Sequence, residues 1–317
     1  MSAATLSPDF WHRIEQALAQ LKPARLTVAA VSRAGTPDRA RHWIPQPLSP
    51  LSDSAAYAAL PPAQQRRYNQ LYALQVTEQF IWLERELVIR PAQRLLGDAM
   101  LPPQIRKLLE AFVADELHHN DALFELLRVA APEIYEHQRF AFFDPPWSVR
   151  LAVAAATRLP RRLPAWILFI GVAEEHTILI CRAYGKDPDC DPAFRAAFRA
   201  HAIDEARHCR MDDLLADWLT AALRPVQQQL SDRLLGQLFR RYYDVRWGTD
   251  RPVLHLAREF GLSPALRQRL LDDAQLGRGP EFRSHLFDQH NAPISFRKAQ
   301  RHRGLAAAIN SVCAPPA

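Results

Sequence analysis

The sequence predicts an all-α protein, and three observations support that fold class. Apolar residues recur with the 3.6-residue period of a helix over most of the 317 residues. No stretch shows a convincing alternation of apolar and polar residues, which would indicate strands. Prolines and capping residues divide the periodic stretches into lengths that are ordinary for helices.

The N-terminal elements follow from the positions of serine and proline. Ser7 is a favourable cap and Pro8 a favourable first helical residue, so a helix is predicted from this point to about Leu21. Residues 22–62 carry seven prolines and are expected to form an extended, wrapping connection with little regular structure. Long helices are then predicted over 63–96, with a kink at Pro91, and over 103–129.

The remaining helices are bounded in the same way. A turn-rich link over 139–147 precedes the next helix, which ends before Pro160. Gly185 ends a later helix, and Asp191 followed by Pro192 begins the longest one. The predicted helices of this half are 148–159, 165–184, 192–223, 225–247, 253–260, 264–275 and 295–311. No linker is polar and flexible enough to divide the chain, so residues 1–317 are predicted to form one domain.

The composition excludes several classes of protein. The net charge is only +6, and the arginines are scattered, so no nucleic-acid partner is expected. The densest basic run is interpreted as a solvated helix face: Arg297, Lys298, Arg301 and Arg303. The most apolar window, 163–173, is far too short for a membrane span. The first residues show no basic stretch followed by an apolar one, and the four cysteines show no CxxC spacing, so a cytoplasmic protein with reduced thiols is predicted.

A repeated motif carries the chemistry. The segment HAIDEARH, 201–208, places His201, Glu205 and His208 on one face of a predicted helix, because they are spaced four and three residues apart. The segment DELHH repeats the pattern with Glu116 and His119. A single E-x-x-H is usually a surface ion pair, but two copies that each follow an aspartate are not expected by chance. Two such helices are typical of a carboxylate-bridged two-metal site in a ferritin-like bundle.

Such a site needs one more carboxylate from each of two other helices. Glu84 lies 32 residues before Glu116 on an apolar stripe and is the first candidate, with Glu86 and Glu78 as rivals. Glu174 lies 31 residues before Glu205, but the local pattern does not separate it from Glu175. Four buried carboxylates would repel one another, and no lysine lies on these helix faces, so two divalent cations are predicted to balance them.

The sequence also predicts the role of two aspartates and the identity of the metal. Asp115 and Asp204 precede the motif glutamates, and each is placed to accept a ring N–H from a histidine on a neighbouring helix. Mixed carboxylate and imidazole ligation suits iron, with manganese as the alternative metal, and leaves positions open for O2.

The order of these motifs resembles the p-aminobenzoate N-oxygenase (AurF-like) family of non-haem di-iron oxygenases. The distinguishing feature is His201, since ordinary ferritin-like di-iron proteins have two histidines. The resemblance covers about residues 65–220 and favours Glu174, which stands about 27 residues before His201. It implies a ferritin-like helical bundle with additional flanking helices, two iron ions per chain that cycle between Fe2+ and Fe3+, and often a homodimer. The implied ligands are Glu84, Glu116, His119, Glu174, His201, Glu205 and His208.

The resemblance also implies an activity. O2 would be the co-substrate, a peroxo-diferric intermediate would form, and an amine nitrogen would be oxygenated to hydroxylamine, nitroso or nitro products in specialised metabolite biosynthesis. The amine could be a small molecule or carrier-bound, in a pocket lined by residues such as Phe80, Phe112, Ile170 and Ile178, and electrons would come from an external reductase or ferredoxin. The alternatives are a di-iron C–H hydroxylase or oxidase, a ferroxidase, a tyrosyl-radical subunit, and a scaffold without metal.

Overall fold

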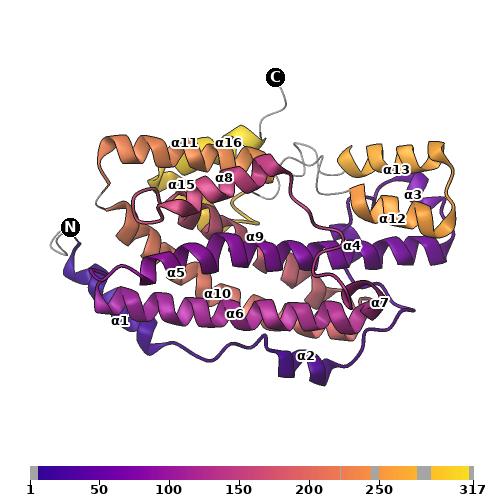
Figure 1. Ribbon diagram of the computed structural model, residues 1–317, viewed down its shortest axis with the longest axis horizontal. Coiled ribbons are helices and arrows are strands. Elements are labelled where there is room, and N and C mark those ends of the chain that lie inside the picture. The colour runs from indigo at the N-terminus through magenta and orange to yellow at the C-terminus, as the bar shows by residue number, and fades with distance from the viewer. Residues whose placement is uncertain (1–5, 222, 244–249, 277–286, 314–317) are drawn as a thin grey trace.

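The computed structural model describes residues 6–221, 223–243, 250–276 and 287–313, and most of them are helical (Figure 1). Among these residues the only extended pairing is a single bridge between His42 and Cys190. The all-α prediction is therefore confirmed. The elements are α1 (Pro8–Ala19), α2 (Val28–Ala34), η2 (Gln46–Leu48), α3 (Ala55–Ala58), α4 (Pro62–Leu83), η3 (Glu84–Ile89), α5 (Arg90–Leu96), α6 (Pro103–Ala130), α7 (Pro132–Tyr135), α8 (Trp147–Arg158), α9 (Ala165–Lys186), α10 (Pro192–Thr220), α11 (Pro225–Tyr242), α12 (Asp250–Phe260), α13 (Pro264–Leu276), α15 (Pro293–Arg301) and α16 (Arg303–Cys313).

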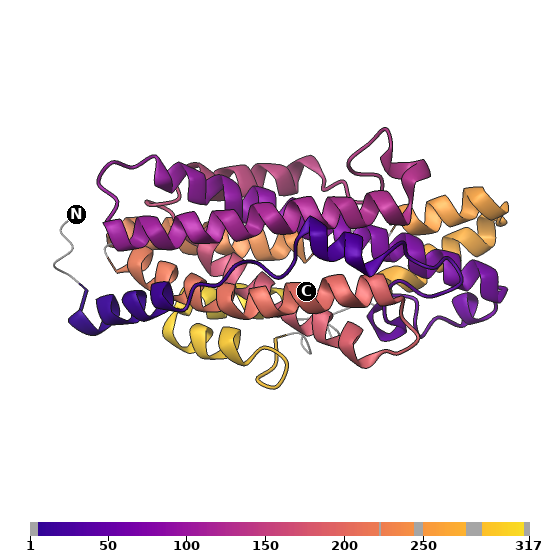
Figure 2. The same ribbon diagram turned by 90° about the horizontal axis from the view of Figure 1, so that it is seen from below.

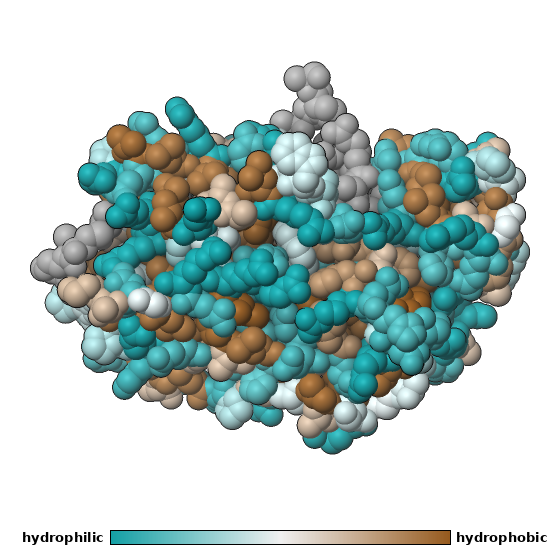
Figure 3. Space-filling model, in the orientation of Figure 1, coloured by the Kyte–Doolittle hydropathy of each residue, from teal (hydrophilic) through white to brown (hydrophobic). Residues whose placement is uncertain are grey.

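Four long rods form the bundle: the continuous helix α4–η3–α5, and α6, α9 and α10 (Figures 1 and 2). Helices α11, α8, α15 and α16 lie over one end of it, and α12 and α13 lie beside α4 at the other. None of the described helices combines the length and the apolar character that crossing a membrane requires. The face shown in Figure 3 is largely hydrophilic, with separate apolar patches.

Each rod carries a polar band between two apolar stretches. On α6, residues 105–113 belong to one hydrophobic cluster and 122–127 to the other, with the DELHH motif between them. On α10, the motif likewise separates 193–198 from 211–219. Because the bands of the rods lie at the same level, the polar residues form one layer inside the bundle, with an apolar core on either side that excludes water from it.

The π-helical segment η3 explains how the helix can include Pro91 without ending there. A proline ring clashes with the carbonyl four residues earlier in an α-helix, here that of Leu87. In the structure the preceding turn is widened, and the N–H of Arg90 donates to the carbonyl of Arg85, five residues back. The helix therefore continues past Pro91, and the widened turn begins at Glu84, one of the predicted ligands. Single π turns are frequent at functional sites.

The N-terminal connection differs from the prediction, because it contains short helices. Thr27 caps α2 and Ser54 caps α3, each accepting a backbone N–H with its side-chain oxygen. The connection nevertheless wraps the bundle as expected: in Figure 2 it runs between α6 and α10. Buried polar side chains of the bundle hold it, since Asn69 pairs with the backbone of Trp43 and Ile44.

Several helix ends also differ. The predicted helix 295–311 is two helices, α15 and α16, separated at His302, whose backbone is extended. The break lets α16 pack very closely on α11, where a side chain at Gly304 would overlap Asp232. Helix α9 continues through Gly185, which lacks a positive φ, to Lys186. Helix α11 ends at Tyr242, and residues 244–247 of the predicted helix lie outside the described residues.

Candidate metal centre

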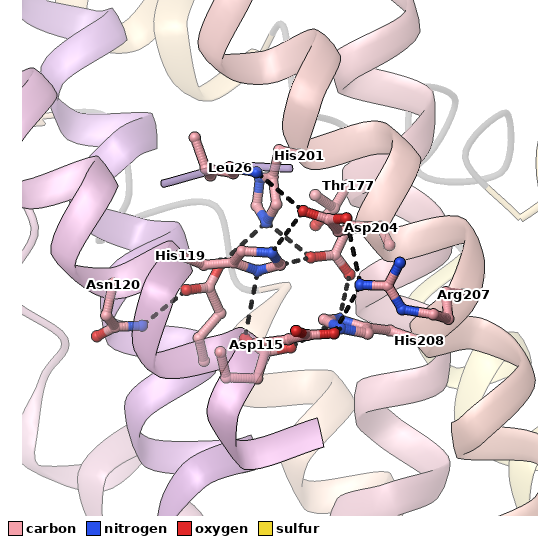
Figure 4. Close-up of polar contacts among 12 residues, drawn as sticks. Leu26, Asp115, His119, Asn120, Thr177, His201, Asp204, Arg207 and His208 are labelled. Atoms are coloured by element: carbon pink, nitrogen blue, oxygen red, sulfur yellow. Dashed lines mark hydrogen bonds and ion pairs between the residues drawn. The ribbon is translucent and has the colours of Figure 1, made fainter. Parts of the chain in front are cut away.

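The structure brings the motif residues of α6 and α10 together in the polar layer. Oε1 of Glu116 lies 2.8 Å from Nδ1 of His208, and Oε1 of Glu205 lies 3.5 Å from Nδ1 of His119. Each distance joins a carboxylate of one helix to a ring of the other. All four side chains are essentially inaccessible to solvent. Figure 4 shows the two rings side by side between the helices.

The third histidine, His201, joins the same cluster. Its Nε2 lies 2.7 Å from Oε1 of Glu205 and 3.2 Å from Oε1 of Glu84. Glu84 is held from the other side by Asn120, whose amide donates to its Oε2 at 2.7 Å. The fold thus places a carboxylate of the π turn against a ring of α10, far away along the chain.

The ligand atoms fall into two overlapping groups. One group consists of Glu84, His119, His201 and Glu205, and the other of Glu116, His119, Glu205 and His208; within each, the ligand atoms lie within 4.8 Å of one another. Glu205 spans both groups, since its Oε1 faces His201 and its Oε2 lies 3.6 Å from Nδ1 of His208. A carboxylate with one oxygen in each group is positioned to bridge two cations.

Glu174, on α9, belongs to neither of these groups. Both of its oxygens are buried without a hydrogen-bond partner among the described residues. Burial, together with the carboxylates of Asp212, Glu205 and Glu116, raises its pKa well above the ordinary value. This side chain therefore faces the other carboxylates of the layer.

The rival carboxylates of the sequence analysis have other partners. Both oxygens of Glu78 accept backbone N–H groups of the link at 141–143, so this residue fixes a loop. Glu86 forms ion pairs with Arg85 and Arg90 near the surface. Glu175 accepts the N–H groups of Ile294 and Ser295 at the start of α15. Of the alternatives, only Glu84 and Glu174 face the layer.

Asp115 and Asp204 brace the rings across the two helices. Oδ2 of Asp204 lies 3.2 Å from Nε2 of His119, and Oδ2 of Asp115 lies 3.4 Å from Nε2 of His208. In both rings Nε2 thus meets an aspartate while Nδ1 points to the glutamates. A carboxylate on the outer nitrogen fixes the ring orientation and leaves the inner nitrogen as a metal donor.

The atoms that point inward fit a pair of cations. Both oxygens of Glu116, Nδ1 of His119 and His208, and Oε2 of Glu205 have no hydrogen-bond partner among the described residues. Buried polar atoms without partners are costly, and here they converge from two helices on one place. Carboxylate and imidazole donors in this number suit iron. The individual ligand roles stay a prediction.

The electrostatics show how the metal-free layer is balanced. Burial and the nearby Glu116 raise the pKa of Glu84 to about 7. Burial alone would lower the pKa of His201 and of His208, but the neighbouring glutamates raise both well above the ordinary value. Burial would likewise raise the pKa of Glu205, yet these two rings lower it. The raised pKa values of His201 and His208 favour their protonated forms in the metal-free protein, which offsets the charge of the carboxylates, and cations would replace those protons.

Sequence reasoning missed four side chains that support the layer. Arg207 joins the two aspartates, with Nη2 2.6 Å from Asp115 and 3.2 Å from Asp204. Asn120 holds Glu84, and the carboxylate of Asp212 raises the pKa of Glu174. Arg207 and Asp212 could have been found on the motif helix, because they lie three residues after Asp204 and four after His208.

Lys298 is the fourth. The other three residues of its basic run, Arg297, Arg301 and Arg303, are exposed as predicted for a solvated face, but Lys298 is buried. Its side chain is 2% exposed, and Nζ lies 2.9 Å from Oδ1 of Asp213. No lysine was expected on the faces of the bundle helices. Lys298 comes instead from α15, in the C-terminal region. The break at His302 and the anchoring of α15 by Glu175 were not visible in the sequence.

The residues expected to line a pocket are all buried. The rings of Phe80 and Phe112 pack on His201 and His208, with centroids 5.8 Å and 4.9 Å apart. Ile170 and Ile178 lie on α9, before and after Glu174. The apolar surroundings of the cluster are therefore in place, and the substrate pocket itself stays a prediction.

Comparison with known proteins agrees with this architecture. No curated protein matches the chain. The sequence model of one family, described as p-aminobenzoate N-oxygenase AurF, matches residues 32–250, which include the whole α4–α10 bundle and every predicted ligand. The chain belongs to the p-aminobenzoate N-oxygenase (AurF) family, which is a family of ferritin-like di-iron helical proteins.

Proposed function

We propose that this protein is a di-iron N-oxygenase that uses O2 to oxygenate the nitrogen of a small-molecule or carrier-bound amine. Family membership supports a di-iron N-oxygenase in general. The observation that carries the proposal for this chain is the position of His201, which lies against both Glu84 and Glu205 and adds a third imidazole to the cluster.

The proposed ligands are Glu84, Glu116, Glu174 and Glu205 with His119, His201 and His208. Two irons held there would supply the binding and reduction of O2. The four carboxylates would match the charge of two divalent ions, so the loaded centre would be close to neutral in its apolar surroundings. The three histidines would add donors without adding charge.

The surrounding residues orient these donors. Asp204 and Asp115 fix the His119 and His208 rings by the contacts described above, and Arg207 forms ion pairs with both aspartates. Phe80 and Phe112 cover two of the rings and exclude water from that side. The reaction to the hydroxylamine would consume one O2, two electrons and two protons per amine and would release water, so an external electron donor is required.

The test combines metal analysis with an isotope. Metal-free protein is loaded with Fe(II), then mixed with a chemical reductant, ¹⁸O2 and a panel of amines that includes p-aminobenzoate as a probe. The proposal predicts a product with ¹⁸O bonded to nitrogen, located by fragmentation in the mass spectrometer. Label on carbon alone would identify a C–H hydroxylase, and Fe(III) formation without any labelled organic product would identify a ferroxidase; either result overturns the proposal.

A further inference from the structure

Helix α15 is anchored directly to the rod that carries Glu174. The next residue, Glu175, accepts the N–H of Ile294 at 2.7 Å and that of Ser295 at 2.6 Å. Neighbouring residues of α9 therefore have different tasks, since one faces the polar layer and the other caps α15. Because the start of α15 is fixed in this way, the residues one turn later have a defined position against α9.

From that position the side chain of Lys298 extends toward α9. Its ammonium is buried and pairs with Asp213 at 2.9 Å. A Cβ atom placed on Gly171 would lie 2.7 Å from Nζ of Lys298 and 3.4 Å from Oδ2 of Asp212. The missing side chain of Gly171 thus opens a space on α9, one turn before Glu174, that the ammonium fills beside the Asp212 carboxylate.

Asp212 connects this ammonium to the polar layer. It is fully buried, and its Oδ2 lies 3.4 Å from the Cβ position of Gly171, one turn before Glu174 on α9. The Lys298 ammonium and the Asp212 carboxylate therefore both border Gly171, one turn before the proposed metal ligand Glu174, and the ammonium comes from a helix outside the family match.

We propose that Lys298 is a positioning residue for the metal centre, holding Asp212 in place over Gly171 so that Asp212 supports the Glu174 carboxylate. This inference rests on the proposed function, because it assigns Glu174 to the metal. Without the ammonium, the buried Asp212 carboxylate loses the cation that fixes its position beside Gly171. Glu174 then loses a fixed neighbour, and outer-sphere partners of this kind typically change metal affinity by about 10- to 100-fold.

The first test is Lys298→Met in the full chain, which keeps the length of the side chain and removes its charge. Metal-free protein is titrated anaerobically with Co(II), and binding is followed by calorimetry and by the visible absorption of the ion. The variant is expected to bind one of its two Co(II) ions about tenfold or more weakly, with a changed absorption spectrum. A binding curve and spectrum equal to those of the wild type would overturn the inference.

The Gly171→Ala variant tests the same role of the ammonium without changing any charge. The added methyl group occupies the place of the ammonium, so the variant should reproduce the weaker Co(II) binding even if Lys298→Met does not fold. Two controls should bind Co(II) like the wild type. Gly236→Ala adds its methyl on α11 at an ordinary 3.7 Å from the Arg240 guanidinium. Arg301→Met removes an exposed cation of α15 that lies 3.9 Å from Asp213.

A double-mutant cycle tests whether the effect passes through Asp212. If it does, Lys298→Met should weaken Co(II) binding less in the Asp212→Asn background than in the wild type. Equal factors in both backgrounds would show that Lys298 acts independently and would contradict the proposed connection. Failure of the wild type to bind two ions would remove the proposed function as well, whereas wild-type binding in every variant would remove only the role of Lys298.

Discussion

Asp204 on α10 accepts from Nε2 of His119 on α6, with 3.2 Å between the atoms, so the ring of one motif is held by the aspartate of the other. The same carboxylate also accepts the backbone N–H groups of residues 25 and 26, at 2.6 Å and 3.0 Å. The N-terminal connection therefore reaches the metal centre through Asp204 (Figure 4). The paired D-E-x-x-H motifs work as a reciprocal brace, because each supplies a ring and the support for the other ring.

Asp204→Asn tests this brace. The amide cannot replace the charge that orients the His119 ring, so affinity for Fe(II) or Co(II) is expected to fall about 10- to 100-fold. Competition with a coloured chelator measures the change. Asp217→Asn is the control, because Asp217 lies on the same helix but pairs with Arg13 at the surface. Equal losses in both variants would show that the effect is not specific to the brace.

Glu84 and Glu86 form a matched pair two residues apart. Glu84→Gln removes a carboxylate that faces His201, and the variant is expected to bind fewer than two metal ions per chain. Glu86→Gln affects only the ion pairs with Arg85 and Arg90, so it should keep the full metal content. Elemental analysis after dialysis separates the two. Full metal content in Glu84→Gln would contradict its assignment.

His201→Ala addresses the residue that distinguishes this cluster from ordinary ferritin-like sites. It is expected to weaken binding of one metal ion, because Glu84 and Glu205 lose the ring between them, and to shorten the lifetime of any coloured species that forms on mixing the Fe(II) protein with O2. Stopped-flow absorption measures that lifetime. His118→Ala, at an exposed position beside the ligand His119, should behave like the wild type. An unchanged lifetime and metal content in His201→Ala would refute its role.

The pKa shifts predict opposite pH dependences with and without metal. For His201 and His208 the folded-state pKa is raised above 6.5, so their contribution to stability is complete below that pH and is lost as the pH rises through the folded-state value. For Glu84, raised from 4.5 to about 7, the penalty on the folded state grows over that interval. Both effects lower the free energy of unfolding of the metal-free protein as the pH increases.

The affinity for metal increases as the pH rises, because the ligands must lose their protons before they bind. Raising the pH from about 5.5 to 8 should therefore increase the gain in melting temperature caused by Mn(II) or Co(II), while the metal-free melting temperature falls. Thermal unfolding at matched ionic strength with and without the ion measures both. A metal-free protein that becomes more stable over this range would contradict the electrostatic description of the cluster.

The spacing of residues within one helix was sufficient to predict which motif residues share a face. Positions three and four apart share a face, so the spacing alone places Glu116 with His119 and His201 with Glu205. Spacing alone could not select Glu84 over Glu86 or Glu174 over Glu175. That selection depends on which side of each helix packs against the neighbouring rods, and the ligand roles await the experiments above.

Long-range packing accounts for what the sequence could not predict. Lys298 lies in a basic run whose pattern resembles a solvated face, and only the anchoring of α15 by Glu175 turns it inward. The backbone N–H groups of residues 25 and 26 carry no sequence signature at all. The widened turn at Glu84 follows from Pro91, but the proline alone indicated a kink and not a π turn.

The central claim, that the buried cluster of α4–η3, α6, α9 and α10 is a two-metal site, is tested most directly by anaerobic titration of the metal-free chain with Fe(II). We predict saturation at two equivalents per chain, with both ions lost together in a Glu205→Ala variant, since this carboxylate reaches both groups. Saturation at one equivalent or none, or two ions retained without Glu205, would contradict it.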